Sequence, residues 1–171
     1  HYLTGLVEHR EETFEQDSRF AFGNTLVDVE EDRTGFAGEL RGEYFKSLFL
    51  SATARYDDNR SFDDYATWQT SASWRISDSI FRVHASAGSG VKYPSLLELY
   101  GEFGPNNFVG NPNLQPEESL GWDAGLETTL FGGRAIVDVT YFQQSLKNEI
   151  FSVFLPFGYT ADNREGESDR K

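Results

Sequence analysis

The residues whose types could bind a metal ion are the acidic ones around a short segment near position 60. Asp57, Asp58, Asp63 and Asp64 lie within eight positions of one another. Ca²⁺ needs several oxygen ligands that converge from a flexible loop, and a hairpin could bring these four carboxylates together. No EF-hand-like pattern accompanies them. The simpler interpretation is a solvated acidic loop, and these four are weak calcium candidates.

The remaining chemistry-bearing residues do not form a catalytic pattern. The histidines, His1, His9 and His84, have none of the spacings of a metal site. Serine, histidine and aspartate residues are present, but nothing in the sequence places them together as a triad. There are no cysteines, which excludes disulfides and thiolate metal sites. The sequence therefore predicts neither an enzyme nor a bound cofactor.

The composition narrows the class of protein. The net charge of -13 argues against binding of nucleic acid or of an anionic membrane surface, since both require basic patches. No stretch approaches about 18 consecutive apolar residues, which excludes a transmembrane helix. A transmembrane β-strand needs only about 10 residues with every second one apolar, and 15% of this chain is aromatic.

The elements that must position these residues are strands, because the dominant period is 2. In 66–76, Trp68 and Trp74 fall on one face and Gln69 and Arg75 on the other. The same alternation predicts six clear strands and two weaker ones, over 36–44, 48–56, 66–76, 81–88, 120–130 and 135–142, and over 2–9 and 161–171.

The connections between the expected strands alternate in length. Long connections are expected at 10–34, 89–118 and 146–160 and a medium one at 57–64, whereas 45–47, 77–79 and 132–133 are tight turns. An up-and-down transmembrane barrel has short turns at one end and long loops at the other. A soluble β-sandwich or lipocalin-like barrel also alternates in hydropathy, but has no reason to gather its long loops at one end.

The two faces of the expected strands favour the membrane barrel. The apolar faces are rich in alanine and glycine, whose side chains are too small to fill a packed core. The opposite faces carry charged residues such as Glu39, Arg55 and Asp138, which a polar lumen accommodates. Aromatic residues lie near strand ends, where interfacial girdles would place them: Tyr44, Tyr56, Trp68, Trp74, Trp122 and Tyr141. The fold class predicted is an all-β, antiparallel, up-and-down transmembrane barrel.

One segment carries a family resemblance. After a glycine-containing strand end come Lys92-Tyr93-Pro94-Ser95-Leu96, then Leu99-Tyr100-Gly101, then Gly110-Asn111-Pro112-Asn113-Leu114-Gln115-Pro116-Glu117. This order resembles the segment near the C-terminal end of TonB-dependent outer-membrane receptors. The upstream Arg55-Tyr56-Asp57-Asp58 and the downstream Lys147-Asn148-Glu149-Ile150 resemble further elements of that family. The prolines shape a rigid loop, and Leu96, Leu97, Leu99 and Tyr100 could anchor it on the barrel rim, so an architectural role is expected for the motif.

The resemblance implies the rest of the protein. It implies that 1–171 is a single segment, of about eight strands, from the C-terminal half of a 22-stranded barrel, with the plug domain and TonB-binding box absent. At this spacing 22 strands need roughly 470 residues. It further implies residence in the bacterial outer membrane, contact with lipid and lipopolysaccharide, and import of a ferric siderophore, haem or cobalamin with the TonB system. This segment alone would not transport.

The exterior loops supply ligand-contact candidates. Aromatic and amide side chains gather in the three long connections, and they suit capture of a large, partly apolar chelate as well as they suit packing of loop on loop. The candidates are Phe20, Phe22, Phe103, Asn106, Phe108, Phe154 and Tyr159. The loop over 10–34 could equally have no role.

Two alternatives to the receptor remain at this point: a porin-like or small eight-stranded pore, and a soluble β-sandwich binding module. A partial barrel also leaves two unpaired edge strands, which are templates for association. We therefore expect the isolated segment to oligomerise or to pair its edges in a non-native way.

Overall fold

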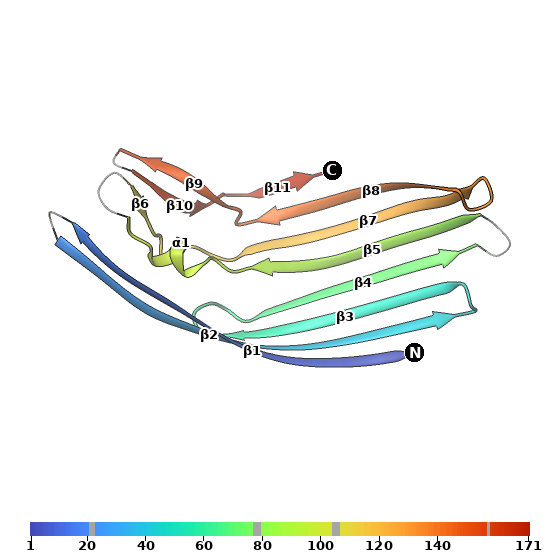
Figure 1. The fold of residues 1–171 in the computed structure, drawn as a ribbon, viewed down its shortest axis with the longest axis horizontal. Coiled ribbons are helices and arrows are strands. Elements are labelled where there is room, and N and C mark those ends of the chain that lie inside the picture. The colour runs from blue at the N-terminus through green and yellow to red at the C-terminus, as the bar shows by residue number, and fades with distance from the viewer. Residues whose placement is uncertain (21–22, 77–79, 104–106, 157) are drawn as a thin grey trace.

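The computed structural model describes residues 1–171 except 21–22, 77–79, 104–106 and 157. Most of the chain forms one long, curved, antiparallel sheet (Figure 1). Its eight strands, in spatial order, are β1 (Tyr2–Phe20), β2 (Gly23–Tyr44), β3 (Leu48–Asn59), β4 (Tyr65–Arg75), β5 (Phe81–Lys92), β7 (Glu117–Leu130), β8 (Ala135–Lys147) and β11 (Glu167–Arg170).

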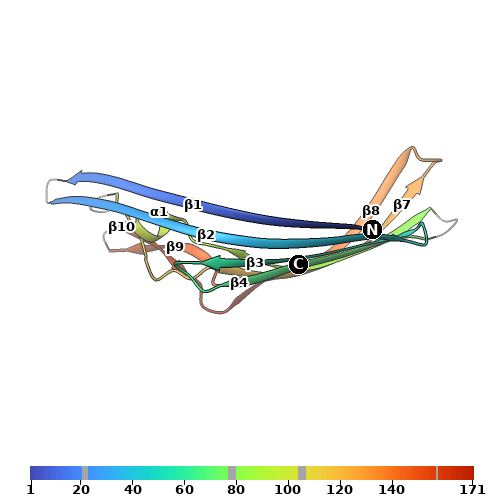
Figure 2. The same ribbon diagram turned by 90° about the horizontal axis from the view of Figure 1, so that it is seen from below.

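The sheet is open. β1 and β11 lie at its two edges and do not pair with each other, so the described residues do not close a small eight-stranded barrel. Seen from below, the strands arch, and β7 and β8 rise away from the other strands at one end (Figure 2). An antiparallel sheet with this order is the up-and-down arrangement that the alternation of the sequence predicts.

The two ends of the sheet differ as predicted. Tight turns lie at one end, here called the turn end, and the long connections lie at the other, the loop end (Figure 1). Phe45 and Lys46 have φ of 53° and 59°, and Gly132 and Gly133 have φ of 67° and 93°, which matches the twist that short hairpins require. The turns predicted at 45–47 and 132–133 are confirmed, whereas the turn predicted at 77–79 lies outside the described residues.

The strand pairing places like side chains in continuous rows. Leu40 of β2 aligns with Ala52, Thr70, Ala87 and Trp122 on the following strands. We call this side of the sheet the apolar face. The tryptophans on it, Trp68, Trp74 and Trp122, are 45%, 49% and 46% exposed, so they do not meet in a dry centre.

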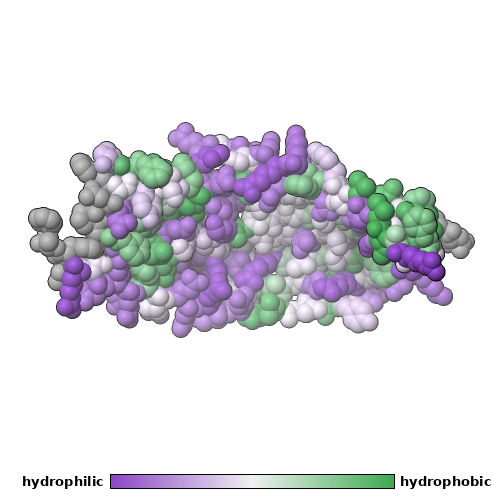
Figure 3. Space-filling model, turned by 45° about the horizontal axis from the view of Figure 1, so that its top comes forward, coloured by the Kyte–Doolittle hydropathy of each residue, from purple (hydrophilic) through white to green (hydrophobic). Residues whose placement is uncertain are grey.

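The opposite side, the ionic face, carries ion pairs between strands. Arg82 of β5 pairs with Glu127 of β7, and His84 of β5 reaches Asp138 of β8, with Nε2 3.1 Å from Oδ2. The imidazole crosses the intervening strand β7 at Gly125, where an added Cβ would lie 2.5 Å from the ring. Figure 3 shows hydrophilic residues over much of the middle of one view and a hydrophobic patch at the turn end.

Two sequence-based expectations were wrong. The 10–34 segment is not a loop, because β1 and β2 continue through it and pair as far as Phe20 and Gly23. The strand expected over 161–171 is two strands: β10 (Gly158–Asn163) belongs to a separate small sheet with β9 (Ile150–Leu155) and β6 (Phe108–Val109), and β11 belongs to the main sheet.

One short helix, α1 (Leu96–Tyr100), precedes β6 at the loop end. Among the described residues, no helix has the length and apolar character needed to cross a membrane. The buried hydrophobic residues of the described chain gather beside this helix, outside the main sheet.

Candidate functional site

The loop end is where the structure brings distant parts of the chain together. Three pieces meet there: the outer hairpin, meaning residues 10–34 of β1 and β2; the motif segment, residues 92–117; and the small sheet of β6, β10 and β9 (Figure 1). We call them together the loop-end assembly. It holds most of the residues that the sequence singled out.

The motif segment begins with a capped helix. Ser95 is the N-cap of α1: its Oγ accepts from the backbone N–H of Glu98 at 3.2 Å, and its own backbone N–H donates to Glu98 Oε2 at 2.8 Å. This reciprocal capping box satisfies two backbone donors that a helix start leaves open. Pro94, buried just before it, holds the preceding residue in extended geometry.

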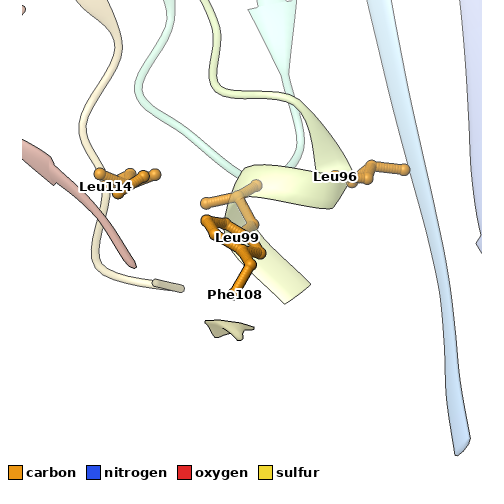
Figure 4. Close-up of a cluster of buried hydrophobic side chains, with 5 residues drawn as sticks. Leu96, Leu99, Phe108 and Leu114 are labelled. Atoms are coloured by element: carbon orange, nitrogen blue, oxygen red, sulfur yellow. The ribbon is translucent and has the colours of Figure 1, made fainter. Parts of the chain in front are cut away.

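The helix anchors the segment by burying one side. Leu96 and Leu99 are 6% and 3% exposed, and they pack with Phe108, Leu114 and Ala161 (Figure 4). Leu96, Leu99, Phe108 and Leu114 come from positions up to 18 residues apart, which the turn of the segment gathers. Leu97, expected as a further anchor, is 42% exposed and does not take part.

The glycines of the motif allow a close backbone approach. The N–H of Gly110 donates to the carbonyl of Gly101 at 2.7 Å, and that of Gly101 donates to the carbonyl of Leu97 at 2.8 Å. A Cβ on Gly110 would lie 2.6 Å from the carbonyl oxygen of Leu99. The Leu-Tyr-Gly and Gly-Asn-Pro parts of the motif are thus packed directly on each other.

Asparagine side chains tie the motif segment to the small sheet. Asn111 Nδ2 donates to the carbonyl of Ala161 at 3.0 Å, and Asn163 Nδ2 donates to the carbonyls of Gln115 and Asn148 at 2.9 and 2.7 Å. Asn163 Oδ1 in turn accepts from the N–H of Gln115 at 2.8 Å. Sequence reasoning missed Asn163, because its partners lie up to 48 residues away and no local pattern marks it.

The remaining motif residues complete this scaffold. Leu114 and Pro116 are almost fully buried. Glu117 accepts from Lys92 Nζ at 3.2 Å and from the N–H of Ile150 at 2.8 Å, which joins β5, β7 and β9. The contacts of the motif are therefore contacts within the fold.

The outer hairpin docks on the motif segment through one glutamine. Gln16 Oε1 accepts from the N–H of Glu102 at 2.9 Å, while its Nε2 donates to the carbonyl of the same residue. Ser18 Oγ donates to that carbonyl as well, at 3.3 Å. Phe14 and Val29 on the same side of the hairpin pack against the buried cluster. Sequence reasoning missed Gln16, which it treated as part of a loop.

The four calcium candidates are not grouped. Asp57 is 4% exposed on the ionic face and pairs with Arg55, whose Nη2 lies 2.6 Å from Oδ1. Asp64 accepts from the Tyr56 hydroxyl at 2.5 Å and from the N–H of Asn59 at 3.2 Å. The hydroxyl lowers the pKa of Asp64 below its ordinary value. Within the described ranges, no three histidine, cysteine or acidic side chains form a metal-binding group.

The aromatic candidates divide between exposed and buried. Phe154 is 87% exposed, Phe103 47% and Tyr159 37%. Phe108, expected to face outward, is 9% exposed in the buried cluster, with ring centroids 5.4 Å from Tyr159 and 6.2 Å from Phe103. Phe22 and Asn106 lie outside the described residues, as does the side chain of Phe20.

The histidines differ in surroundings. His9 on β1 meets Thr34 and Glu11, with Nδ1 3.0 Å from the hydroxyl and Nε2 3.4 Å from the carboxylate. His84 lies far along the sheet on the ionic face, paired with Asp138. The side chains that the loop end gathers are aromatic rings, amides and charged groups held by the scaffold, an inventory suited to non-covalent recognition.

Comparison with known families matches nearly the whole chain. The sequence profile described as "TonB dependent receptor-like, beta-barrel" matches residues 8–171. The match includes the motif segment and every strand of the sheet, although it begins within β1.

Solved structures share the fold. The siderophore receptor PirA from Pseudomonas aeruginosa superposes with a TM-score of 0.79 at 20% identity, covering 98% of this chain and 34% of that one. The ferric enterobactin receptor PfeA from the same organism, in complex with enterobactin, gives 0.79 at 17%, covering 98% and 29%. The copper transporter OprC gives 0.71 at 15%, covering 94% and 30%. The chain thus spans about a third of the length of these structures.

Proposed function

This chain belongs to the TonB-dependent receptor β-barrel family, and from that premise we propose that it forms part of the barrel wall of an outer-membrane receptor that binds and imports a scarce nutrient chelate. The observation that carries the proposal is the separation of the two sheet faces. One face presents exposed leucines and tryptophans, and the other presents ion pairs between strands.

The apolar face has dimensions that suit a bilayer. Trp68 and Trp74 lie six residues apart on β4, on the same face. At about 3.3 Å per residue this separation is roughly 20 Å, close to the apolar band of about 25 Å on outer-membrane barrels. Tyr44 lies in the register row of Trp74, near the turn end. Lipid and lipopolysaccharide acyl chains would contact the face between these aromatic rows.

The ionic face would then line the lumen. A plug domain and a TonB-binding segment, in parts of the protein outside these residues, would fill that lumen and couple the receptor to the TonB system. Residues 1–171 alone would not transport. The length ratio to the solved receptors supports this assignment to a larger barrel.

The loop end would face the exterior and contribute to ligand capture. Phe103, Phe154 and Tyr159 present exposed rings there, and such rings suit a large, partly apolar chelate. Ferric siderophores, haem and cobalamin are the ligand classes of this proposal. A siderophore receptor and an enterobactin complex among the similar folds support the first class.

The test is growth rescue by the full-length protein that contains this chain. It is expressed in a bacterium that lacks its own receptors for siderophores, haem and cobalamin. A ferric siderophore or haem is then supplied as the only source of iron, or cobalamin as the only source of that vitamin. We expect one class to restore growth, and deletion of TonB to abolish that growth. The assignment is wrong if the protein reaches the outer membrane and no chelate restores growth, or if growth persists without TonB.

A further inference from the structure

A polar recess lies at the loop end between the outer hairpin and the start of the motif segment. It has a volume of about 390 Å³ and is lined by Arg10 and Glu12 of β1, 31–33 of β2, and the 91–95 stretch that includes Tyr93. Two further charged residues of the lining already have partners outside it: Asp32 pairs with Arg60, and Lys92 pairs with Glu117. These residues are separate from the exposed aromatic rings, which come from 103, 154 and 159.

Where β1 and β2 line the recess, residues of the same charge lie opposite each other on the two strands. Arg10 aligns with Arg33 across the two strands, and Glu12 aligns with Glu31. Like charges directly opposite each other on paired strands are destabilising. On β1 the repulsion is relieved, because Arg10 Nη1 lies 3.4 Å from Glu12 Oε1. On β2, neither Arg33 nor Glu31 forms an ion pair with any described residue.

Arg33 is held in position by an aromatic ring, and its guanidinium acts on the Glu31 carboxyl only from beyond ion-pair distance. Its guanidinium carbon lies 4.3 Å from the centroid of the Tyr93 ring. That ring is packed in turn against Phe62 and Tyr65, with centroid separations of 5.7 and 5.8 Å. A cation–π contact engages the flat face of the guanidinium and leaves N–H donors at its edge for an acceptor.

Glu31 is the complementary group. Its Oε1 is buried and accepts no hydrogen bond in the described structure. Burial, and then the neighbouring Glu12 carboxylate, raise the pKa of Glu31, and the Arg33 guanidinium offsets only part of that rise. A cation placed beside this carboxyl would relieve both effects, because it would pair with the charge and supply the missing donor.

We infer that the recess binds a zwitterionic group, with its carboxylate on Arg33 and its ammonium on Glu31. This inference rests on the proposed function and deepens it, because it assigns the bound chelate an amino-carboxylate portion. Arg33 and Glu31 are two residues apart on one face of β2, so their Cα atoms are roughly 6.8 Å apart. A ligand whose ammonium and carboxylate groups are about that far apart would place one group at Glu31 and the other at Arg33.

Fragment probes of matched size test the charge pairing directly. The full-length receptor in detergent is titrated with 5-aminopentanoate, pentanoate and pentylamine, and dissociation constants are measured by saturation-transfer NMR. We expect the zwitterion to bind about tenfold more tightly than either singly charged probe, because each of those probes leaves one of the two charged side chains without a partner.

Two variants should separate the two halves of the site. Arg33→Gln should remove the advantage of the zwitterion over pentylamine and keep its advantage over pentanoate, and Glu31→Gln should do the reverse. Arg19→Gln and Glu15→Gln are the matched controls, because they lie on the opposite side of the same hairpin. Folding of each variant is checked by SDS gel electrophoresis, in which a folded barrel migrates differently before and after heating.

The outcomes distinguish this inference from the proposed function. Equal affinity for the three probes, no binding of the zwitterion, or equal losses in the controls would overturn the zwitterion site. If growth rescue by a chelate persists in that case, the receptor assignment stands alone. If no chelate restores growth while the fragment preferences follow the expected pattern, the site stands and the receptor assignment falls.

Discussion

Arg55 on β3 reaches Glu8 on β1 across the strand between them, with Nη1 3.0 Å from Oε2. The guanidinium passes over Gly35 of β2, where an added Cβ would lie 2.3 Å from Nη2. Arg55 also holds Asp57 on its own strand, at 2.6 Å. One arginine thus links β3 to β1 across β2 on the ionic face, and the link exists because Gly35 between them has no side chain.

Gly35→Ala should therefore destabilise the sheet. The new methyl group would displace the guanidinium and separate it from Glu8, and overpacking of this kind costs about 1–3 kcal/mol. Gly38→Ala is the matched control, because nothing lies within 4 Å of its Cβ position. Thermal unfolding of the full-length protein in detergent measures the difference. Equal melting temperatures for the two variants would contradict the steric account.

Gln16→Ala should loosen the outer hairpin from the motif segment. The substitution removes both hydrogen bonds to the Glu102 backbone, each worth about 1 kcal/mol. Hydrogen exchange of the Glu102 amide should accelerate about tenfold or more for a loss of that size. Glu15→Ala, on the other side of the strand, should leave this exchange unchanged. Unaltered protection of Glu102 in the Gln16 variant would show that the packing of Phe14 and Val29 holds the hairpin by itself.

The loop around Asp64 should lose stability in acid. The Tyr56 hydroxyl, and then the Asn59 amide, lower the pKa of Asp64 in the folded loop. A depressed carboxyl pKa stabilises the fold above the ordinary value of 3.8 and loses that effect as the pH falls through the folded pKa. The protection factors of the 59–65 amides, which compare each exchange rate with the intrinsic rate at the same pH, are followed from pH 6 down to about 3 and should fall at the acid end. In Tyr56→Phe the stabilisation should be smaller and should disappear at a higher pH; an identical profile would rule out the hydroxyl as its source.

Residues 1–171 expressed alone should associate. β1 runs for 19 residues along one edge of the sheet, and only its β2 side is paired. Such an edge is a template for another strand. Light scattering in detergent should show dimers or larger species at concentrations where the full-length protein is monomeric. A monodisperse monomer would mean that the edges are covered in a way this sheet does not show.

The middle of the sheet could be predicted from the sequence, because each strand there has one apolar and one polar face. The outer hairpin could not. Beyond His9 nearly every residue of β1 on both faces is polar, as in Arg10, Glu11 and Glu12, and the widely spaced phenylalanines do not make a pattern, so a loop is the natural prediction. Backbone pairing with β2 extends the strand regardless of side-chain polarity.

The loop-end contacts were predictable only in part. The prolines and closely spaced leucines of the motif act locally, and they indicate an anchored segment in which Leu96 and Leu99 are buried. The Gln16–Glu102 contact joins residues 86 apart, and neither residue type marks it. Phe108 falls in a long connection, for which the sequence predicts an exterior position. The strand that buries it has only two residues, which is too short for alternation to reveal.

The contact of His84 with Asp138 across Gly125 has a consequence for the register of the strands in the closed barrel. Strands that slide by two positions keep every side chain on its proper face, so hydropathy alone does not forbid such a slip. A side chain that spans three strands does forbid it, because its partner would move out of reach by roughly 7 Å. The stagger between neighbouring strands is linked to the strand tilt and the diameter of a closed barrel. These spanning side chains, each laid over a glycine, would therefore fix the contribution that β1 to β3 and β5 to β8 make to that stagger.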